Sequence, residues 1–81
     1  MFEANKKRLK LEHGAIAYLI VDDGEVILVD DSDSGRQCFR WYMVGDAELF
    51  DTEVSARTMG DAIESARLAW PEQANDIEVI K

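Results

Sequence analysis

The sequence predicts an α+β domain, a twisted antiparallel sheet of four to six strands with one helix packed on one face. Three observations lead to this fold class. Short segments rich in β-branched and aromatic residues are separated by Gly, Asp and Ser, which is typical of strands joined by turns. One segment alternates apolar and polar residues, and near the C-terminus the apolar spacing changes to three and four residues, which marks a helix. The predicted order is four or five strands, the helix and a last strand, β-β-β-β-(β)-α-β.

The first half of the chain predicts a β-hairpin. Ala15–Val21 is an apolar run rich in β-branched and aromatic residues, which indicates a buried strand. Asp23-Gly24 follows it, and this pair favours a type I′ turn because both central residues of that turn need positive φ. Val26–Val29 is then the returning strand. Upstream, Arg8–Glu12 alternates apolar and polar residues and predicts an additional first strand.

Two further strands follow a polar loop. Residues 30–37 are mostly Asp, Ser and Gly and predict a loop. Cys38–Val44 predicts a strand in which Trp41 faces the core, while Arg40 and Tyr42 point to the other face. Leu49–Ala56 alternates apolar and polar residues and predicts an antiparallel strand with one face in water.

The C-terminal part predicts the single helix. Apolar residues recur at helical spacing from Met59 to Trp70. Thr58 is a suitable N-cap, and Asp61 three residues later approximates a capping box. Pro71 ends the helix because the residue before a proline avoids the α region. Trp70 and Ile63 are expected to pack between this helix and the strands.

The length predicts one domain over residues 1–81, with residues 1–7 as a flexible basic N-terminus and a last short strand over residues 77–80. Cys38 is the only cysteine, so no internal disulfide forms and the chain is expected in a reducing cytoplasm. The longest apolar run, Ala15–Val21, is too short to span a bilayer. No membrane association is therefore expected.

The charge of the chain limits the class of its partner. It contains 9 Lys plus Arg against 17 Asp plus Glu, which gives a net charge of −8. Direct binding of a nucleic acid is not expected, because nucleic-acid affinity comes largely from cationic contacts to phosphates. A basic nucleic-acid-binding protein is the complementary partner. The alternative is that the charge serves only solubility.

The carboxylates lie in two clusters, Asp22–Asp33 and Asp46–Glu53, neither of which contains Lys or Arg. Residues two apart on one face of a strand are about 6.7 Å apart, which is close to every second phosphate of a DNA strand at about 3.4 Å each. Asp51 and Glu53 are therefore expected to present charge at about every second phosphate, and Asp46, Glu48 and the tip of the predicted hairpin extend this row. Tyr42 is expected at the same interface, since Tyr is enriched at binding hot spots. The predicted partner-binding residues are Asp30, Asp31, Asp33, Asp46, Glu48, Asp51, Glu53 and Tyr42.

No catalytic, cofactor or metal site is predicted, and the chain is expected not to be an enzyme. Asp30, Ser32 and Ser34 occupy the spacing of a calcium loop, but its twelfth position, which needs a bidentate Glu, is Trp41. His13 has no nucleophile in a recognisable relation to it. The cysteine lacks an evident cause of a lowered pKa.

The segment Val54-Ser-Ala-Arg-Thr-Met-Gly-Asp-Ala-Ile-Glu-Ser-Ala-Arg-Leu-Ala-Trp70 resembles the strand-to-helix entry of HicB-type antitoxin domains, a β-β-β-α-β fold. In size, acidity and simple fold, the chain also resembles small inhibitors of bacteriophages and mobile elements, including anti-CRISPR proteins. That resemblance implies a protein of the host bacterial cytoplasm that binds and inhibits a nucleic-acid-handling machine by covering its nucleic-acid-binding surface. The first resemblance implies the alternative, an antitoxin-like domain, and no functional residue carries over from that family. In this alternative the chain is a homodimeric interaction domain, and we expect exposed strand edges and Tyr42 to form its interface.

Overall fold

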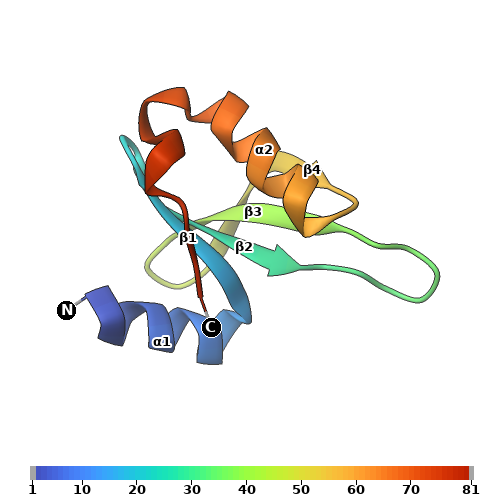
Figure 1. Ribbon diagram of the computed structural model, residues 1–81. Coiled ribbons are helices and arrows are strands. Elements are labelled where there is room, and N and C mark those ends of the chain that lie inside the picture. Colours follow the sequence, from blue (N-terminus) through green and yellow to red (C-terminus); the bar gives the residue numbers. More distant parts are fainter. Residues whose placement is uncertain (1, 81) are drawn as a thin grey trace.

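The computed structural model describes residues 2–80, and side chains from Lys6 onward. Its strands form one five-stranded antiparallel sheet in the order β4-β3-β2-β1-β5, which confirms the α+β fold class. Helix α2 covers one face of the sheet and α1 lies on the other (Figure 1). The elements are α1 (Phe2–His13), β1 (Ala15–Val21), β2 (Gly24–Asp30), β3 (Phe39–Val44), β4 (Leu49–Ala56), α2 (Met59–Ala69), the 3-10 helix η1 (Pro71–Asp76) and β5 (Glu78–Val79).

The predicted hairpin and the predicted helix are both confirmed. Strands β1 and β2 pair with Val21 opposite Gly24, so the central residues of the turn are Asp22 and Asp23. Neither has a positive φ, so the predicted type I′ turn on Asp23-Gly24 is wrong, although the hairpin itself forms. Thr58 caps α2, because its hydroxyl oxygen accepts a hydrogen bond from the backbone N–H of Asp61 at 3.1 Å. After Pro71 the chain continues for one short 3-10 helix before β5.

The larger part of the core lies between the sheet and α2. Trp41 is fully buried at its centre, and its indole Nε1 donates a hydrogen bond to the carbonyl oxygen of Ala62 at 2.9 Å. The buried positions of α2 are the small residues Ala62 and Ala66, which let the helix approach the sheet closely. Trp70 meets Trp41 edge to face at 6.0 Å between ring centroids, as expected, whereas Ile63 is only half buried.

The predicted strand over Arg8–Glu12 is wrong, because this segment belongs to α1. The alternation rested on Leu9 and Leu11, and only Leu9 is buried, whereas Leu11 is 85% exposed. One apolar contact suits a helix as well as a strand, and Lys, Arg, Leu and Glu are good helix formers. Gly14, at φ +73°, ends the helix and donates its N–H to the carbonyl oxygen of Lys10.

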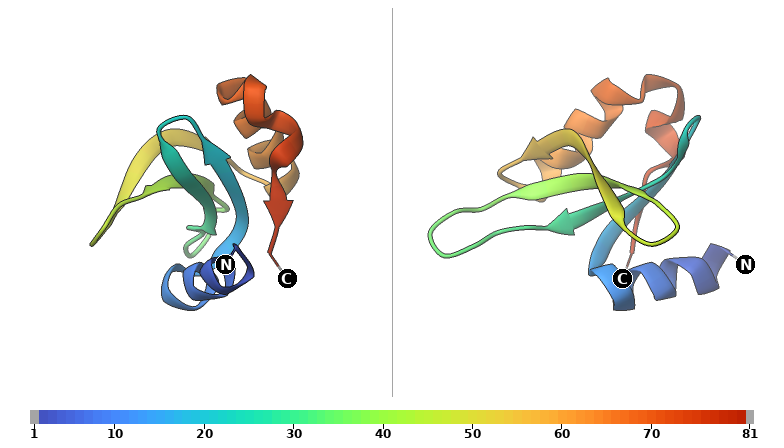
Figure 2. Two further views of the ribbon diagram at one scale, coloured as in Figure 1. Left: turned by 90° about the vertical axis from the view of Figure 1, so that its left-hand side faces the viewer. Right: turned by 180° about the vertical axis from the view of Figure 1, so that it is seen from behind.

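Only one helix was predicted from the sequence, and α1, which covers part of the second face of the sheet, was not predicted. Leu9 of α1 packs there against Ala15, Tyr18 and Ile27. Lys6 adds an ion pair to Glu78 of β5. Residues 2–7, which were expected to belong to a flexible basic N-terminus, lie within α1. Met1 is outside the described residues. Helix α1 packs on β1, and the outer part of this face, over β3 and β4, is not covered by a helix (Figure 2).

The two ends of the sheet are built from different connections. The β1–β2 turn, the β3–β4 turn and η1 lie at one end of the molecule, on the left in Figure 1. The long β2–β3 loop projects from the opposite end. The longest dimension of the molecule is 37 Å, so surfaces at the two ends are well separated.

Candidate functional site

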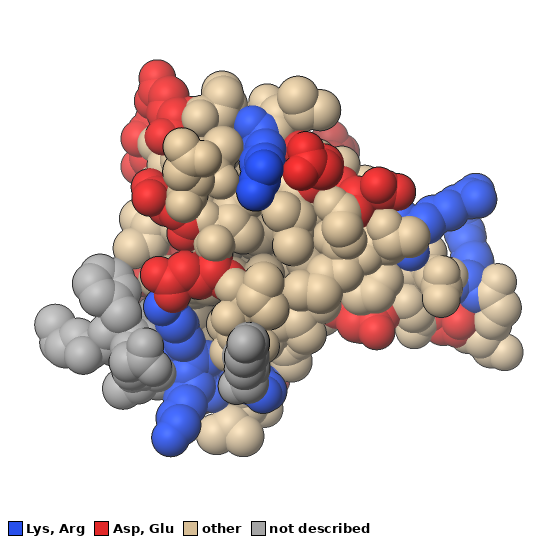
Figure 3. All heavy atoms as spheres, in the orientation of Figure 1, with Lys and Arg blue, Asp and Glu red and all other residues tan. Residues whose placement is uncertain are grey.

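Acidic side chains from three separate segments gather at one end of the molecule. The β1–β2 turn, the β3–β4 turn and η1 contain no Lys or Arg. The amide of Gln73 in η1 donates a hydrogen bond to Asp22 at 3.3 Å, which holds η1 beside the β1–β2 turn. Figure 3 shows the acidic atoms over these two segments at the upper left. We call this surface the acidic end, and it consists of Asp22, Asp23, Glu25, Asp46, Glu48, Glu72 and Asp76.

Local geometry forces the carboxylates of the β3–β4 turn outward. The turn is closed by a hydrogen bond from the N–H of Gly45 to the carbonyl oxygen of Glu48 at 2.9 Å. A Cβ on Gly45 would lie 2.8 Å from that oxygen and 2.5 Å from the ring of Phe50, so only glycine fits there. In this tight turn Asp46 and Glu48 are both exposed.

Most carboxylates of the acidic end have no partner within the described part of the chain. Asp23, Asp46, Glu48, Glu72 and Asp76 are exposed and make no side-chain hydrogen bond or ion pair with residues that the structure describes. Their charge is therefore available to a partner, and the field of several like charges adds over the surface.

The carboxylates of the β2–β3 loop, in contrast, are partly used by the loop itself. Asp30 accepts a hydrogen bond from the N–H of Ser32 at 2.9 Å, and the contact with Ser32 lowers the pKa of Asp30. Ser32 in turn accepts from the N–H of Cys38 at 2.9 Å. Asp33 and Arg36 exchange two backbone hydrogen bonds at 2.9 and 3.0 Å. The loop is therefore a hydrogen-bonded arm that extends the sheet.

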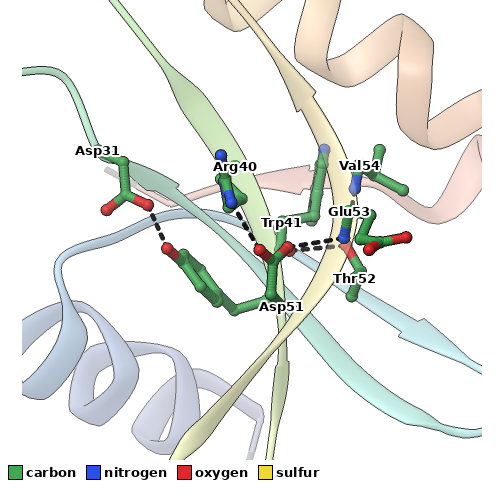
Figure 4. Close-up of polar contacts among 8 residues, drawn as sticks. Asp31, Arg40, Trp41, Asp51, Thr52, Glu53 and Val54 are labelled. Atoms are coloured by element: carbon green, nitrogen blue, oxygen red, sulfur yellow. Dashed lines mark hydrogen bonds and ion pairs between the residues drawn. The ribbon is translucent and has the colours of Figure 1, made fainter.

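A polar network continues from this arm across the open face of β3 and β4 (Figure 4). The hydroxyl of Tyr42 donates a hydrogen bond to Asp31, and this bond is the main cause that raises the pKa of Tyr42 to about 12. Arg40 donates to Asp51 at 2.5 Å, a charge-assisted bond that raises the pKa of Arg40. Tyr42, Asp31 and Asp51 are thus brought together by contacts within the protein.

Asp51 also stabilises a β-bulge in the edge strand β4. Its Oδ1 accepts the N–H of Glu53 at 2.7 Å, and this bond, with a smaller effect of Arg40, lowers the pKa of Asp51. Thr52 donates its hydroxyl to the carbonyl oxygen of Trp41 at 2.7 Å. Glu53 has φ +67°, a left-handed conformation that is uncommon for a residue other than glycine. The register between β3 and β4 shifts at this point.

The bulge overturns one sequence prediction. A regular row of charge along β4 requires Asp51 and Glu53 to project from one face at an even spacing. Because the register shifts and Glu53 is left-handed, this regular spacing is not formed. The alternation in Leu49–Ala56 gave no sign of the bulge, since the residue that carries the positive φ is a glutamate.

The structure also divides the residues that the sequence grouped together. Asp46 and Glu48 lie at the acidic end, whereas the loop residues Asp30, Asp31 and Asp33 lie at the opposite end, and Asp51 and Glu53 lie on β4 between them. Sequence reasoning missed Glu72 and Asp76. The last strand was predicted, but its pairing partner was not. Antiparallel pairing of Glu78 with Tyr18 places the residues that precede β5 beside the β1–β2 turn.

Neither a metal cluster nor a membrane span is found in the part of the chain that the structure describes. No group of three or more His, Cys, Asp or Glu side chains there is arranged to hold a metal ion. No helix in the same part is long and apolar enough to cross a membrane.

No protein-family model matches this chain, and neither a curated protein nor a solved structure matches it. The resemblances to HicB-type antitoxins and to small acidic inhibitors therefore stay predictions.

Proposed function

We propose that the protein is a non-enzymatic binding protein whose acidic end docks on a basic, nucleic-acid-handling protein of the host and inhibits it by covering its nucleic-acid-binding surface. The supporting observation is the convergence of carboxylates from three segments that are distant in the sequence. Five of the seven, Asp23, Asp46, Glu48, Glu72 and Asp76, are exposed and have no partner among the described residues, and the three segments contain no Lys or Arg.

The charge distribution supports a protein partner of opposite charge. Surfaces that bind phosphates need cations, and a surface of carboxylates is suited to the Lys and Arg side chains that line a nucleic-acid-binding groove. Encounter between two such surfaces is accelerated by long-range attraction and is weakened by salt. The two turns and the short helix η1 that carry this charge are already ordered by the sheet. They therefore lose little conformational entropy on binding, which favours affinity.

The alternative, a homodimer formed through strand edges, receives less support. Strand β4 is one edge of the sheet, but its bulge and its carboxylates Asp51 and Glu53 interrupt the ladder that a second strand would need. Bulges and charges on edge strands are common means by which proteins prevent such pairing. Strand β5, the other edge, is only two residues long.

Affinity capture tests the proposal. The immobilised protein is incubated with a nuclease-treated bacterial lysate at low salt, and the bound proteins are eluted with rising salt and identified by mass spectrometry. We expect basic nucleic-acid-binding proteins that elute at intermediate salt, and inhibition of the purified partner on its nucleic acid by added protein. Capture of acidic or neutral proteins alone, or binding that salt does not weaken, would contradict the proposal.

A further inference from the structure

A shallow groove of about 930 Å³ lies at the end of the molecule opposite the acidic end. It runs between the β2–β3 arm and the last residues of β4. Three arginines from three different segments line it, Arg36 from the arm, Arg40 from β3 and Arg57 after β4. We call it the arginine groove.

Two of these guanidinium groups are unused by the described part of the chain. Arg36 and Arg57 are exposed, and neither makes an ion pair or a side-chain hydrogen bond with a residue that the structure describes. Arg40 binds Asp51 through one terminal nitrogen, and its buried Nε has no hydrogen-bond acceptor among the residues that the structure describes. The chain has 17 Asp and Glu residues, yet none of those that the structure describes pairs with either of these two guanidiniums.

The groove lacks the excess of negative charge that the whole protein carries. Its three arginines are matched by three carboxylates, Asp31 and Asp33 of the lining and Asp51, which pairs with Arg40, whereas the net charge of the chain is −8. Asp31 is engaged by the hydroxyl of Tyr42, which leaves Asp33 as the uncommitted carboxylate. Charge at the acidic end is screened at this distance, because the Debye length is about 8 Å at physiological salt.

We infer that the arginine groove binds the phosphate group of a small ligand, either a free nucleotide or the terminal phosphate of a short oligonucleotide. One planar guanidinium fork suffices for a carboxylate, whereas two unpaired guanidiniums from different segments, in a groove that Arg40 also lines, suit a tetrahedral phosphate with several charged oxygens. The groove is large enough for a nucleotide. A long polyanion fits less well, because its other phosphates would extend over acidic surface.

Titration of the isolated protein tests this inference independently of any protein partner. Backbone amide NMR shifts and calorimetry are followed with inorganic phosphate, ATP, and a dinucleotide with and without a 5′-phosphate; acetate is the carboxylate control. We expect saturable shifts over the arm and the end of β4. Tighter binding of ATP than of the phosphorylated dinucleotide assigns the groove to free nucleotides, and the reverse order assigns it to nucleic-acid ends.

Amino-acid substitutions test whether the phosphate ligands bind in the arginine groove. Arg36→Ala with Arg57→Ala is expected to weaken phosphate-ligand binding at least about tenfold, as charged hydrogen bonds are lost. Lys7→Ala with Lys10→Ala on α1 removes the same charge and should leave binding unchanged. Asp33→Asn should tighten it. Absence of saturable binding by every phosphate probe overturns the inference, as does equal binding of acetate or an equal loss in the two double variants.

Discussion

The two ends of the sheet use their carboxylates differently. At the acidic end, Asp46 and Glu48 project from a tight turn and contact no cation among the described residues. Away from that end, Asp31 in the arm and Asp51 on β4 accept hydrogen bonds from Tyr42 and Arg40, respectively. The first group is free to act on a partner, whereas the second is part of the protein's own structure.

This difference shows that the density of acidic residues along the chain does not locate a binding surface. The stretch from Asp22 to Asp33 is split by the length of β2, so its two halves lie at opposite ends of the molecule. Residues far apart in sequence, such as Asp22 and Gln73, become neighbours instead. Whether a carboxylate already has a partner decides its availability more than its exposure does.

The largest effect is expected from a substitution that weakens the packing of β3 against α2. Trp41→Phe removes the buried hydrogen bond to the Ala62 carbonyl and leaves a small cavity beneath α2. We expect the free energy of unfolding in urea to fall by roughly 2–3 kcal/mol. Trp70→Phe, at the half-buried partner ring, is the control and should cost less. An equal loss in both variants would show that Trp41 is not the anchor of α2.

A smaller effect should distinguish paired from unpaired carboxylates. Asp51→Ala removes the acceptor of the Glu53 N–H and the partner of Arg40, so we expect a measurable loss of stability. Asp46→Ala should leave stability unchanged or slightly higher, since it relieves repulsion. Because the pKa of Asp51 is lowered in the fold, its contribution is present above about pH 4 and is lost as the pH falls further. Chemical denaturation of both variants between neutral and acid pH measures this, and equal behaviour of the two would refute the distinction.

The smallest effect concerns Tyr42 at high pH. Its pKa is raised to about 12, whereas an unfolded tyrosine titrates near about 10. The unfolded chain therefore loses this proton first, and the stability that the bond to Asp31 provides is full below about pH 10 and is lost as the pH rises toward about 12. The stability advantage of the wild type over Tyr42→Phe should shrink across this range. A constant difference would mean that the hydroxyl is not bonded to Asp31.

Much of the fold was predictable because its signals are local. Asp23-Gly24 between two apolar runs indicates the hairpin, although the turn itself falls on Asp22 and Asp23. Thr58, together with the helical spacing of apolar residues from Met59 to Trp70, indicates α2. The helix α1 was not predictable from periodicity, because it buries only Leu9 of its described apolar residues and has no clear amphipathic pattern. Its helical propensity was the better signal.

Less of the candidate site was predictable, since it depends on tertiary contacts. The exposure of the carboxylates Asp46 and Glu48 was predictable, because they lie in a turn that the local sequence indicates. The ion pair between Arg40 and Asp51 follows from the register of β3 and β4, which the bulge changes. The approach of η1 to the β1–β2 turn requires that β5 pair with β1, which no local pattern specifies.

The capture experiment with two variants of equal charge tests the central claim most directly. One variant removes three carboxylates of the acidic end, by Asp23→Asn, Asp46→Asn and Glu48→Gln. The other removes three exposed carboxylates elsewhere, by Asp33→Asn, Glu53→Gln and Glu64→Gln. With the same net charge, the first should lose the basic partner at a salt concentration where the second retains it as the wild type does. Equal retention by both variants, or loss in the second alone, would contradict the assignment of the acidic end as the binding surface.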